Sequence, residues 1–176
     1  HGIRAVGYRP RFIIRKSLWS NELEMKEQAD LQIISNDETG KEILRREIIE
    51  SIDAGVPVLA FGVVGPPEIS IIAGYDQGGE VLIGWGCMTD GLSANQFMPN
   101  GMYKQDNWFN QAGPNNTYGI ILLERAAKLE KEQVYREAVE WAYRVMTLPK
   151  SKTHLFGLAA YKGWAERDAP CSWARS

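Results

Sequence analysis

The stretch from residue 47 to residue 85 constrains the fold more strongly than any other part of the chain. It reads EIIESIDAGVPVLAFGVVGPPEISIIAGYDQGGEVLIGW, a helical pattern that stops at a glycine and is followed by three short apolar segments. The connections between these segments, Gly-Pro-Pro-Glu and Asp-Gln-Gly-Gly-Glu, are too short to hold the helix that joins parallel strands. We therefore predict an antiparallel meander of three strands, at residues 56–64, 69–75 and 80–87.

A helix is predicted directly before this meander. The sequence Thr39-Gly40-Lys41-Glu42 matches a capping box, in which Thr39 caps the helix and Glu42 reaches back to the cap. Gly55 ends the helix, and Pro57 prevents its continuation. Apolar residues recur at helical spacing between these two signals, at Ile43, Leu44, Ile48, Ile49 and Ile52.

The rest of the chain supplies further strands and helices. Strand patterns occupy residues 8–16, 31–34 and 118–123. Helical patterns occupy residues 128–146 and 156–166, and a helix tail precedes Gly7. In the first of the two long helices the residues expected to face the core are Val134, Ala138, Trp141 and Val145.

Two segments are less regular. Residues 21–29 fit either a solvated helix or an ordered loop, and residues 89–116 are predicted to form a long polar loop with aromatic anchors. At 176 residues the chain is expected to be a single domain, residues 1–176. The predicted class is α+β, with an antiparallel sheet of about four to six strands packed against helices.

Composition and charge limit the classes of partner that we expect for this chain. The net charge is -2, and the basic residues Arg9, Arg11, Arg15 and Lys16 form only a short cluster inside a strand pattern, so we expect no nucleic-acid partner. No apolar run approaches the roughly 20 residues of a membrane-spanning helix, and no signal-peptide pattern is present. We expect no membrane partner and a cytoplasmic location, where two cysteines stay reduced.

One strand of the meander carries a resemblance to a known family. Residues 68–76, EISIIAGYD, follow a Pro-Val strand and precede a strand with Trp85. This arrangement resembles the histidine strand of papain-like cysteine peptidases. Within them it is most similar to the double-glycine peptidase-like group, in particular to proteins related to the N-terminal domain of the butirosin-biosynthesis acyltransferase. Residues 156–166, FGLAAYKGWAE, are similar to a later helix of that group. The resemblance implies a papain-like core that lacks its first helix.

The same resemblance argues against peptidase activity. Active members need a cysteine at the start of an early helix, a histidine that activates it, and an Asn or Asp that orients the histidine. The histidine position holds Glu68, and residues 84–86 contain neither Asn nor Asp. By the same resemblance, we expect the chain to begin after the cysteine helix. Of the two cysteines, Cys87 is expected to be a core residue. The sequence around Cys171 is only weakly similar to the sequence around a papain nucleophile. We therefore expect no catalytic residues of this type.

Six residues are candidates for ligand binding in the cleft of such a core. Glu68 is either a ligand-contacting acid or a solvated carboxylate, whereas Asp76 is more simply a turn residue and Ser70 a structural one. The aromatic candidates either line a pocket or anchor the long loop. The full set is Glu68, Ser70, Asp76, Trp85, Tyr103 and Trp108. No cofactor and no metal site are expected, because the glycines form turns and the two histidines lack paired cysteines.

Three functions follow from these patterns. The first is a non-catalytic binding module for a small molecule or peptide, because the sheet is kept while the catalytic residues are lost. The second is an acyl transferase or hydrolase that uses a thiol, which depends on the resemblance alone. The third is a homo-oligomeric interaction protein, in which the strand at residues 8–16 and the helix with Tyr161 and Trp164 pair between chains.

Overall fold

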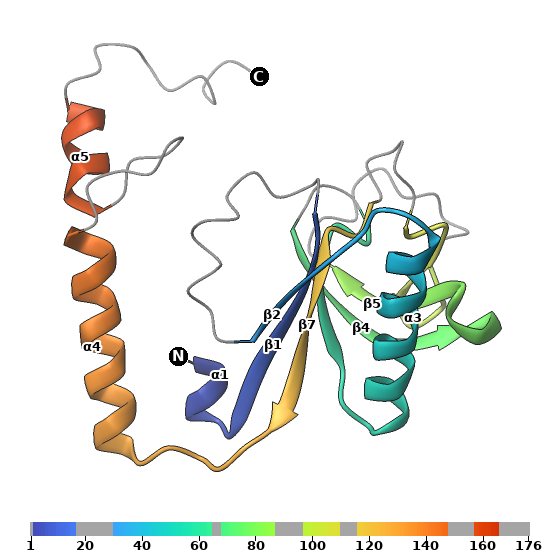
Figure 1. Ribbon diagram of the computed structural model, residues 1–176, viewed down its shortest axis with the longest axis horizontal. Helices are drawn as coiled ribbons and strands as arrows, with labels where there is room; N and C mark the ends of the chain where they lie inside the picture. The colour runs from blue at the N-terminus through green and yellow to red at the C-terminus, as the bar shows by residue number, and fades with distance from the viewer. Residues whose placement is uncertain are drawn as a thin grey trace. The chain divides into compact units, whose positions relative to one another are not determined.

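The computed structural model describes residues 2–16, 30–64, 68–86, 97–109, 116–147 and 157–165. These residues belong to two compact units. One unit spans Tyr8–Ala126, and the other combines His1–Gly7 with Ala127–Ser176. Figure 1 labels most of the helices and strands of the two units. The single-domain organisation expected from chain length stays a prediction.

The larger unit is built on a seven-stranded sheet with the order β2-β1-β7-β3-β4-β5-β6. All neighbouring strands are antiparallel except β1 and β2, which pair in parallel. The mixed α+β class is therefore confirmed, with one strand more than expected. The strands are β1 (Tyr8–Arg15), β2 (Leu31–Ile34), β3 (Val58–Phe61), β4 (Ile69–Asp76), β5 (Val81–Gly86), β6 (Tyr103–Asp106) and β7 (Gly119–Arg125).

The meander is confirmed as β3-β4-β5, and the strand predictions for β1, β2 and β7 are also confirmed. The prediction that residues 89–116 form one loop is wrong, because β6 lies within them and pairs with β5. In β6 the buried Tyr103 and Gln105 alternate with the exposed Lys104 and Asp106. This alternation is only four residues long and mostly polar, so it gave too weak a strand signal.

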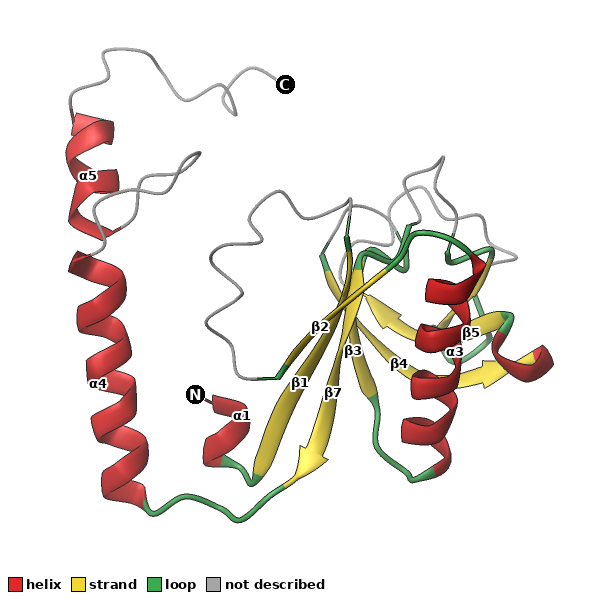
Figure 2. Ribbon diagram, viewed as in Figure 1, coloured by secondary structure: helices red, strands yellow, loops and turns green. Residues whose placement is uncertain are grey.

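One face of the sheet is covered by α3 (Glu38–Asp53), as Figure 2 shows. Leu44 and Ile48 of α3 are fully buried and belong to the same apolar cluster as Ile13, Ile72 and Ile120 of the sheet. This covered face therefore holds the core of the unit, and the helical spacing of the apolar residues explains why α3 packs there.

The start of α3 differs from the prediction. The cap is Asp37, whose carboxylate accepts hydrogen bonds from the backbone N–H groups of Thr39 (3.1 Å) and Gly40 (3.2 Å). The prediction that Thr39 is the cap is wrong, because Asp37 has the extended backbone of a cap while Thr39 already lies in the first turn. At the other end Gly55 has a φ of 75°, which suits the residue after a helix.

The second face of the sheet is also apolar. Ile71 pairs with Leu59 on one side and with Trp85 on the other, so the three side chains share this face. Ile71 and Trp85 keep exposed fractions of 40% and 49%. Described residues of the larger unit thus pack one face against a helix and present exposed apolar side chains on the other.

The smaller unit contains α1 (Gly2–Ala5), α4 (Lys131–Thr147) and α5 (Gly157–Ala165). An ion pair of 3.1 Å joins Arg4 to Glu137. The expected core contacts of α4 are wrong, since Val134 and Val145 are only half-buried and Ala138 and Trp141 are exposed. In the described residues α4 has no buried side chain, because its own unit offers it only two short helices. A helix with the length and apolarity to cross a membrane is absent from the described residues.

Candidate functional site

Two of the six candidate residues, Ser70 and Tyr103, lie together in the core under α3. Both are buried, and the Tyr103 hydroxyl donates to the backbone carbonyl oxygen of Ile71 at 3.2 Å. Burial raises the pKa of the Tyr103 phenol to about 12, and a hydrogen bond with Ser70 partly offsets the rise. These side chains therefore form a neutral, buried polar pair within the sheet.

The candidates Glu68 and Asp76 lie at the two ends of β4. Glu68 is exposed, and its backbone carbonyl oxygen accepts from the Gly62 N–H at 3.2 Å. The Asp76 carboxylate accepts from Lys104 at 2.9 Å and from the Gln77 backbone N–H at 2.7 Å. The hydrogen bond from Lys104 is the main cause of the lowered pKa of Asp76. Asp76 thus has the turn role that the sequence predicts.

Trp85 and Trp108 lie in different environments. Trp85 lies on the second face of the sheet with half of its side chain exposed, whereas Trp108 is buried and donates its indole N–H to the Gly79 carbonyl at 3.0 Å. The six candidates therefore do not converge on one cavity. Their role in ligand binding stays a prediction. The candidate site that the structure favours is a cavity at the N-terminal end of α3.

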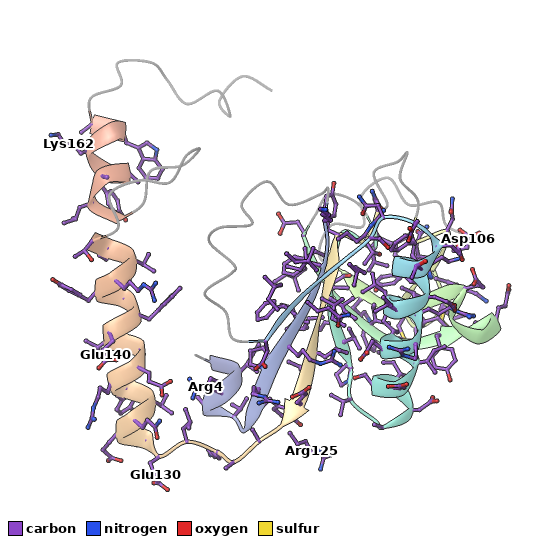
Figure 3. The ribbon with its side chains drawn as sticks, in the orientation of Figure 1. Arg4, Asp106, Arg125, Glu130, Glu140 and Lys162 are labelled. Atoms are coloured by element: carbon purple, nitrogen blue, oxygen red, sulfur yellow. The ribbon has the colours of Figure 1, made fainter. Side chains whose placement is uncertain are left out.

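A cavity with a volume of about 590 Å³ lies at the N-terminal end of α3. Four segments form its wall: the approach to α3 with the first turn, the turn between β4 and β5, the start of β5, and the residues after β6. Trp108 is the only one of the six candidates in this wall. The polar members that matter below are Asn36, Asp37, Lys41, Glu80, Asp106 and Asn107; Figure 3 labels Asp106.

Negative charge predominates in the wall of this cavity. The lining residues include four carboxylates, of Asp37, Glu38, Glu80 and Asp106, but only one cation, Lys41. Lys41 contacts Glu80 at 2.9 Å and Glu38 at 3.5 Å, which holds the pKa of Glu80 below and the pKa of Lys41 above their usual ranges. In the part of the chain that the structure describes, no hydrogen bond or ion pair is made by the Asp106 carboxylate.

A buried aromatic pair backs this polar wall. Trp108 and Phe109 meet edge to face with ring centroids 5.8 Å apart. Besides the bond from its indole, Trp108 accepts at its backbone carbonyl from the Thr117 N–H at 2.9 Å and from the Thr117 hydroxyl at 2.8 Å. These bonds hold the ring in place, so this side of the cavity is preorganised.

The backbone is strained at two points in the same wall. Gln77 has a φ of 51° and Asn107 a φ of 48°, and within the described residues they are the non-glycine positions with positive φ. Such conformations cost free energy and cluster at binding sites and active sites. Sequence analysis missed this site because its residues come from separate segments, although Asn107 next to Trp108 and Gln77 before two glycines were available as turn signals.

The chemistry that the cavity can perform is limited. None of the described lining residues is Ser, Thr, Cys or His, so the usual pair of nucleophile and imidazole base is missing from this wall. The described residues contain no cluster of His, Cys, Asp and Glu that could hold a metal ion. Comparison with protein-family models, curated proteins and solved structures gives no significant match for the chain.

Proposed function

We propose that this protein is a non-catalytic binding module for a small polar molecule or peptide, and that the cavity at the start of α3 is its binding site. The observation that carries the proposal is a cavity of about 590 Å³ with a hydrogen-bonding wall and no nucleophile of the usual kind. This volume lies within the range of roughly 300–1,000 Å³ that is typical of ligand pockets.

The charge of the wall favours a ligand with amino or guanidinium groups. Four carboxylates and one ammonium group line the wall, so a cationic group of the ligand gains electrostatic attraction there. Asp106, which makes no described side-chain bond, is the acceptor best placed to bind such a group. Trp108 and Phe109 offer apolar contact beside it.

The same proposal includes a degenerate cysteine-peptidase-like core. Its support is the order of elements, a helix followed by the antiparallel meander β3-β4-β5, with Glu68 directly before β4 at the position of the histidine. Cys87 and Cys171 lie outside the described residues. A core of this kind without a histidine at that position fits binding better than thiol chemistry.

The test is a binding screen with two matched variants. Diamines, amino sugars and short basic peptides are screened against the wild-type protein by isothermal titration calorimetry. For each molecule that binds, Asp106→Asn is expected to weaken affinity by about tenfold, the typical cost of losing one charge-assisted hydrogen bond. Glu50→Gln, an exposed carboxylate further along α3, is the control and is expected to bind as the wild type does.

Either of two results contradicts the proposal. One is that no molecule of the screen binds the wild-type protein. The other is that a molecule binds but Asp106→Asn and Glu50→Gln lower its affinity equally, which places the ligand outside the cavity.

A further inference from the structure

The side chain of Arg15 is buried and has no negative partner among the described residues. Its exposed fraction is 1%, although the guanidinium stays charged at every ordinary pH. Nε donates to the amide oxygen of Asn36 at 2.9 Å, and Nη1 donates to the amide oxygen of Asn116 and to the carbonyl oxygen of Thr117 (3.1 Å). The Phe109 ring covers one face, with its centroid 3.9 Å from Cζ. All these described partners are neutral.

Two N–H bonds of this guanidinium, both on Nη2, have no acceptor in the described part of the chain. Of the five N–H bonds, one on Nε and two on Nη1 are engaged, and Nη2 finds no acceptor among the described residues. A buried charge with unused donors is costly. Such an arrangement is expected where an anion completes the site.

The guanidinium of Arg15 contacts two residues of the cavity wall. Nε and Nη2 form one edge of the planar guanidinium, the edge that binds carboxylates in a bidentate manner. Nε on this edge is bonded to Asn36, and Asn36 and Phe109 both line the cavity at the start of α3. The guanidinium therefore lies directly behind this wall, with Asn36 in the place of one oxygen of an oxyanion.

We infer that the Nε/Nη2 edge of Arg15 is an anchor for a carboxylate or phosphate group of the ligand. This group accepts one hydrogen bond from Nε and one from Nη2, and it displaces the amide oxygen of Asn36. This inference depends on the proposed function and makes the ligand more specific. A molecule that places an oxyanion on Arg15 and an amino group near Asp106 is zwitterionic. Amino acids, short peptides and phosphorylated amines have this chemistry.

The test observes Arg15 directly in the ¹⁵N-labelled full-length protein. The Arg15 Nε–H signal, assigned by through-bond correlation to the Arg15 backbone, is followed by NMR during titration with sodium acetate and, separately, with inorganic phosphate at constant ionic strength. We expect this signal to shift and saturate, while the signal of Arg46, an exposed arginine of α3, does not saturate. Saturation by acetate alone indicates a carboxylate ligand, and saturation by phosphate alone indicates a phosphorylated one.

Two variants complete the test. Asn36→Ala removes the competing acceptor and leaves Arg15 in place, so the anion is expected to bind several-fold more tightly than in the wild type. Arg15→Lys keeps the charge but lacks the fork, and the affinity is expected to fall by about tenfold or more. The wild-type and Asn36→Ala spectra decide the matter even if Arg15→Lys does not fold.

An Arg15 signal that neither anion moves overturns the inference, as does unchanged affinity in Asn36→Ala together with unchanged affinity in Arg15→Lys. The two proposals fail separately. A screened ligand that depends on Asp106 but binds Arg15→Lys at full strength leaves the binding function and removes the anchor. A saturable Arg15 shift without any ligand in the screen does the reverse.

Discussion

The Tyr103 hydroxyl lies 2.8 Å from the point where a β-carbon on Gly84 would stand. The two residues pair across β5 and β6, and the same β-carbon would also overlap the carbonyl oxygen of Ile71. Only a glycine at position 84 leaves room for the phenol of Tyr103 to pass over β5 and reach the Ile71 carbonyl on β4. The pair therefore makes this end of the sheet, near its β6 edge, sensitive to very small substitutions.

Gly84→Ala is accordingly expected to destabilise the protein by about 3 kcal/mol, because the obstacle includes backbone atoms that cannot move aside cheaply. Gly74→Ala on the neighbouring strand is the control. Its β-carbon would meet Ile83 at an ordinary 3.7 Å, so little change or a slight gain is expected. Urea unfolding followed by circular dichroism measures both. Equal losses in the two variants would contradict the steric explanation.

The stability of the protein is expected to fall as the pH rises from about 10 to about 12. Burial raises the pKa of Tyr103 from the ordinary value of 10.0 to about 12 in the folded protein. Its contribution is complete below pH 10 and is lost as the pH approaches 12, since the unfolded phenol releases its proton first. The slope is at most about 1.4 kcal/mol per pH unit.

Tyr103→Phe tests this dependence. The variant loses one hydrogen bond, worth about 1 kcal/mol at neutral pH, but the part of the alkaline slope due to Tyr103 disappears. Urea midpoints between pH 8 and the alkaline limit compare the two proteins, and absorbance at 295 nm follows phenol ionisation. A Tyr103→Phe variant with the full wild-type slope would exclude Tyr103 as the source.

The cap of α3 can be assigned by three substitutions. Asp37→Ala removes the acceptor of two backbone N–H groups and is expected to lower the melting temperature by a few degrees, whereas Thr39→Ala is expected to leave it nearly unchanged. Asp37→Asn keeps the cap. Thermal unfolding by circular dichroism compares the three, and a larger loss in Thr39→Ala than in Asp37→Ala would restore Thr39 as the cap.

The pH dependence of the same cap has a definite sign. The hydrogen bond from the Ser35 hydroxyl, followed by that from the Gly40 N–H, lowers the pKa of Asp37. The stabilisation is therefore present above the pKa of an unfolded aspartate and is lost as the pH falls through the lower folded value. Asp37→Asn should lack this acid-side loss, and a wild-type acid limb that persists in the variant would point to other carboxylates.

A partly buried ion pair connects α3 to the sheet. Arg11 of β1 bonds to Glu47 of α3, and also to Glu124 of β7 at 3.1 Å. A double-mutant cycle with Arg11→Met and Glu47→Gln is expected to give a coupling free energy of about 1 kcal/mol. The exposed pair Arg46 and Glu50 within α3 is the control and should give almost none. Equal couplings would mean that burial adds nothing to the first pair.

The parts of the fold that could be predicted from the sequence are those with a local signal. The apolar spacing in α3 and the turns between β3, β4 and β5 are contained within short windows of sequence, so they were predictable. The strand β6 could not be predicted, because its short polar sequence carries no strand pattern and only its pairing with β5 defines it as a strand. The cap was shifted by two residues because Asp37 and Thr39 both suit that role, and only backbone conformation separates them.

The candidate site could be predicted from the sequence even less well than the fold. Asn36, Glu80 and Asp106 come from three segments that the sheet brings together, and no spacing in the sequence relates them. Arg15 was visible only as one member of a basic cluster. Its burial depends on Asn116 and Phe109, which are about a hundred residues away. Ser70 and Tyr103 were candidates for ligand binding, and the structure shows that both are buried.

The position of β7 in the sheet has a consequence for how the chain must fold. β7 lies between β1 and β3 and supplies the pairing of both, yet it is the last strand of the sheet along the sequence. On a ribosome, β1 is made more than a hundred residues before β7, its antiparallel partner, although its parallel partner β2 follows soon after it. The early strands must therefore wait with unpaired edges until residue 125 has emerged. Such long-range closure makes folding slow and leaves a nascent chain that depends on protection from aggregation.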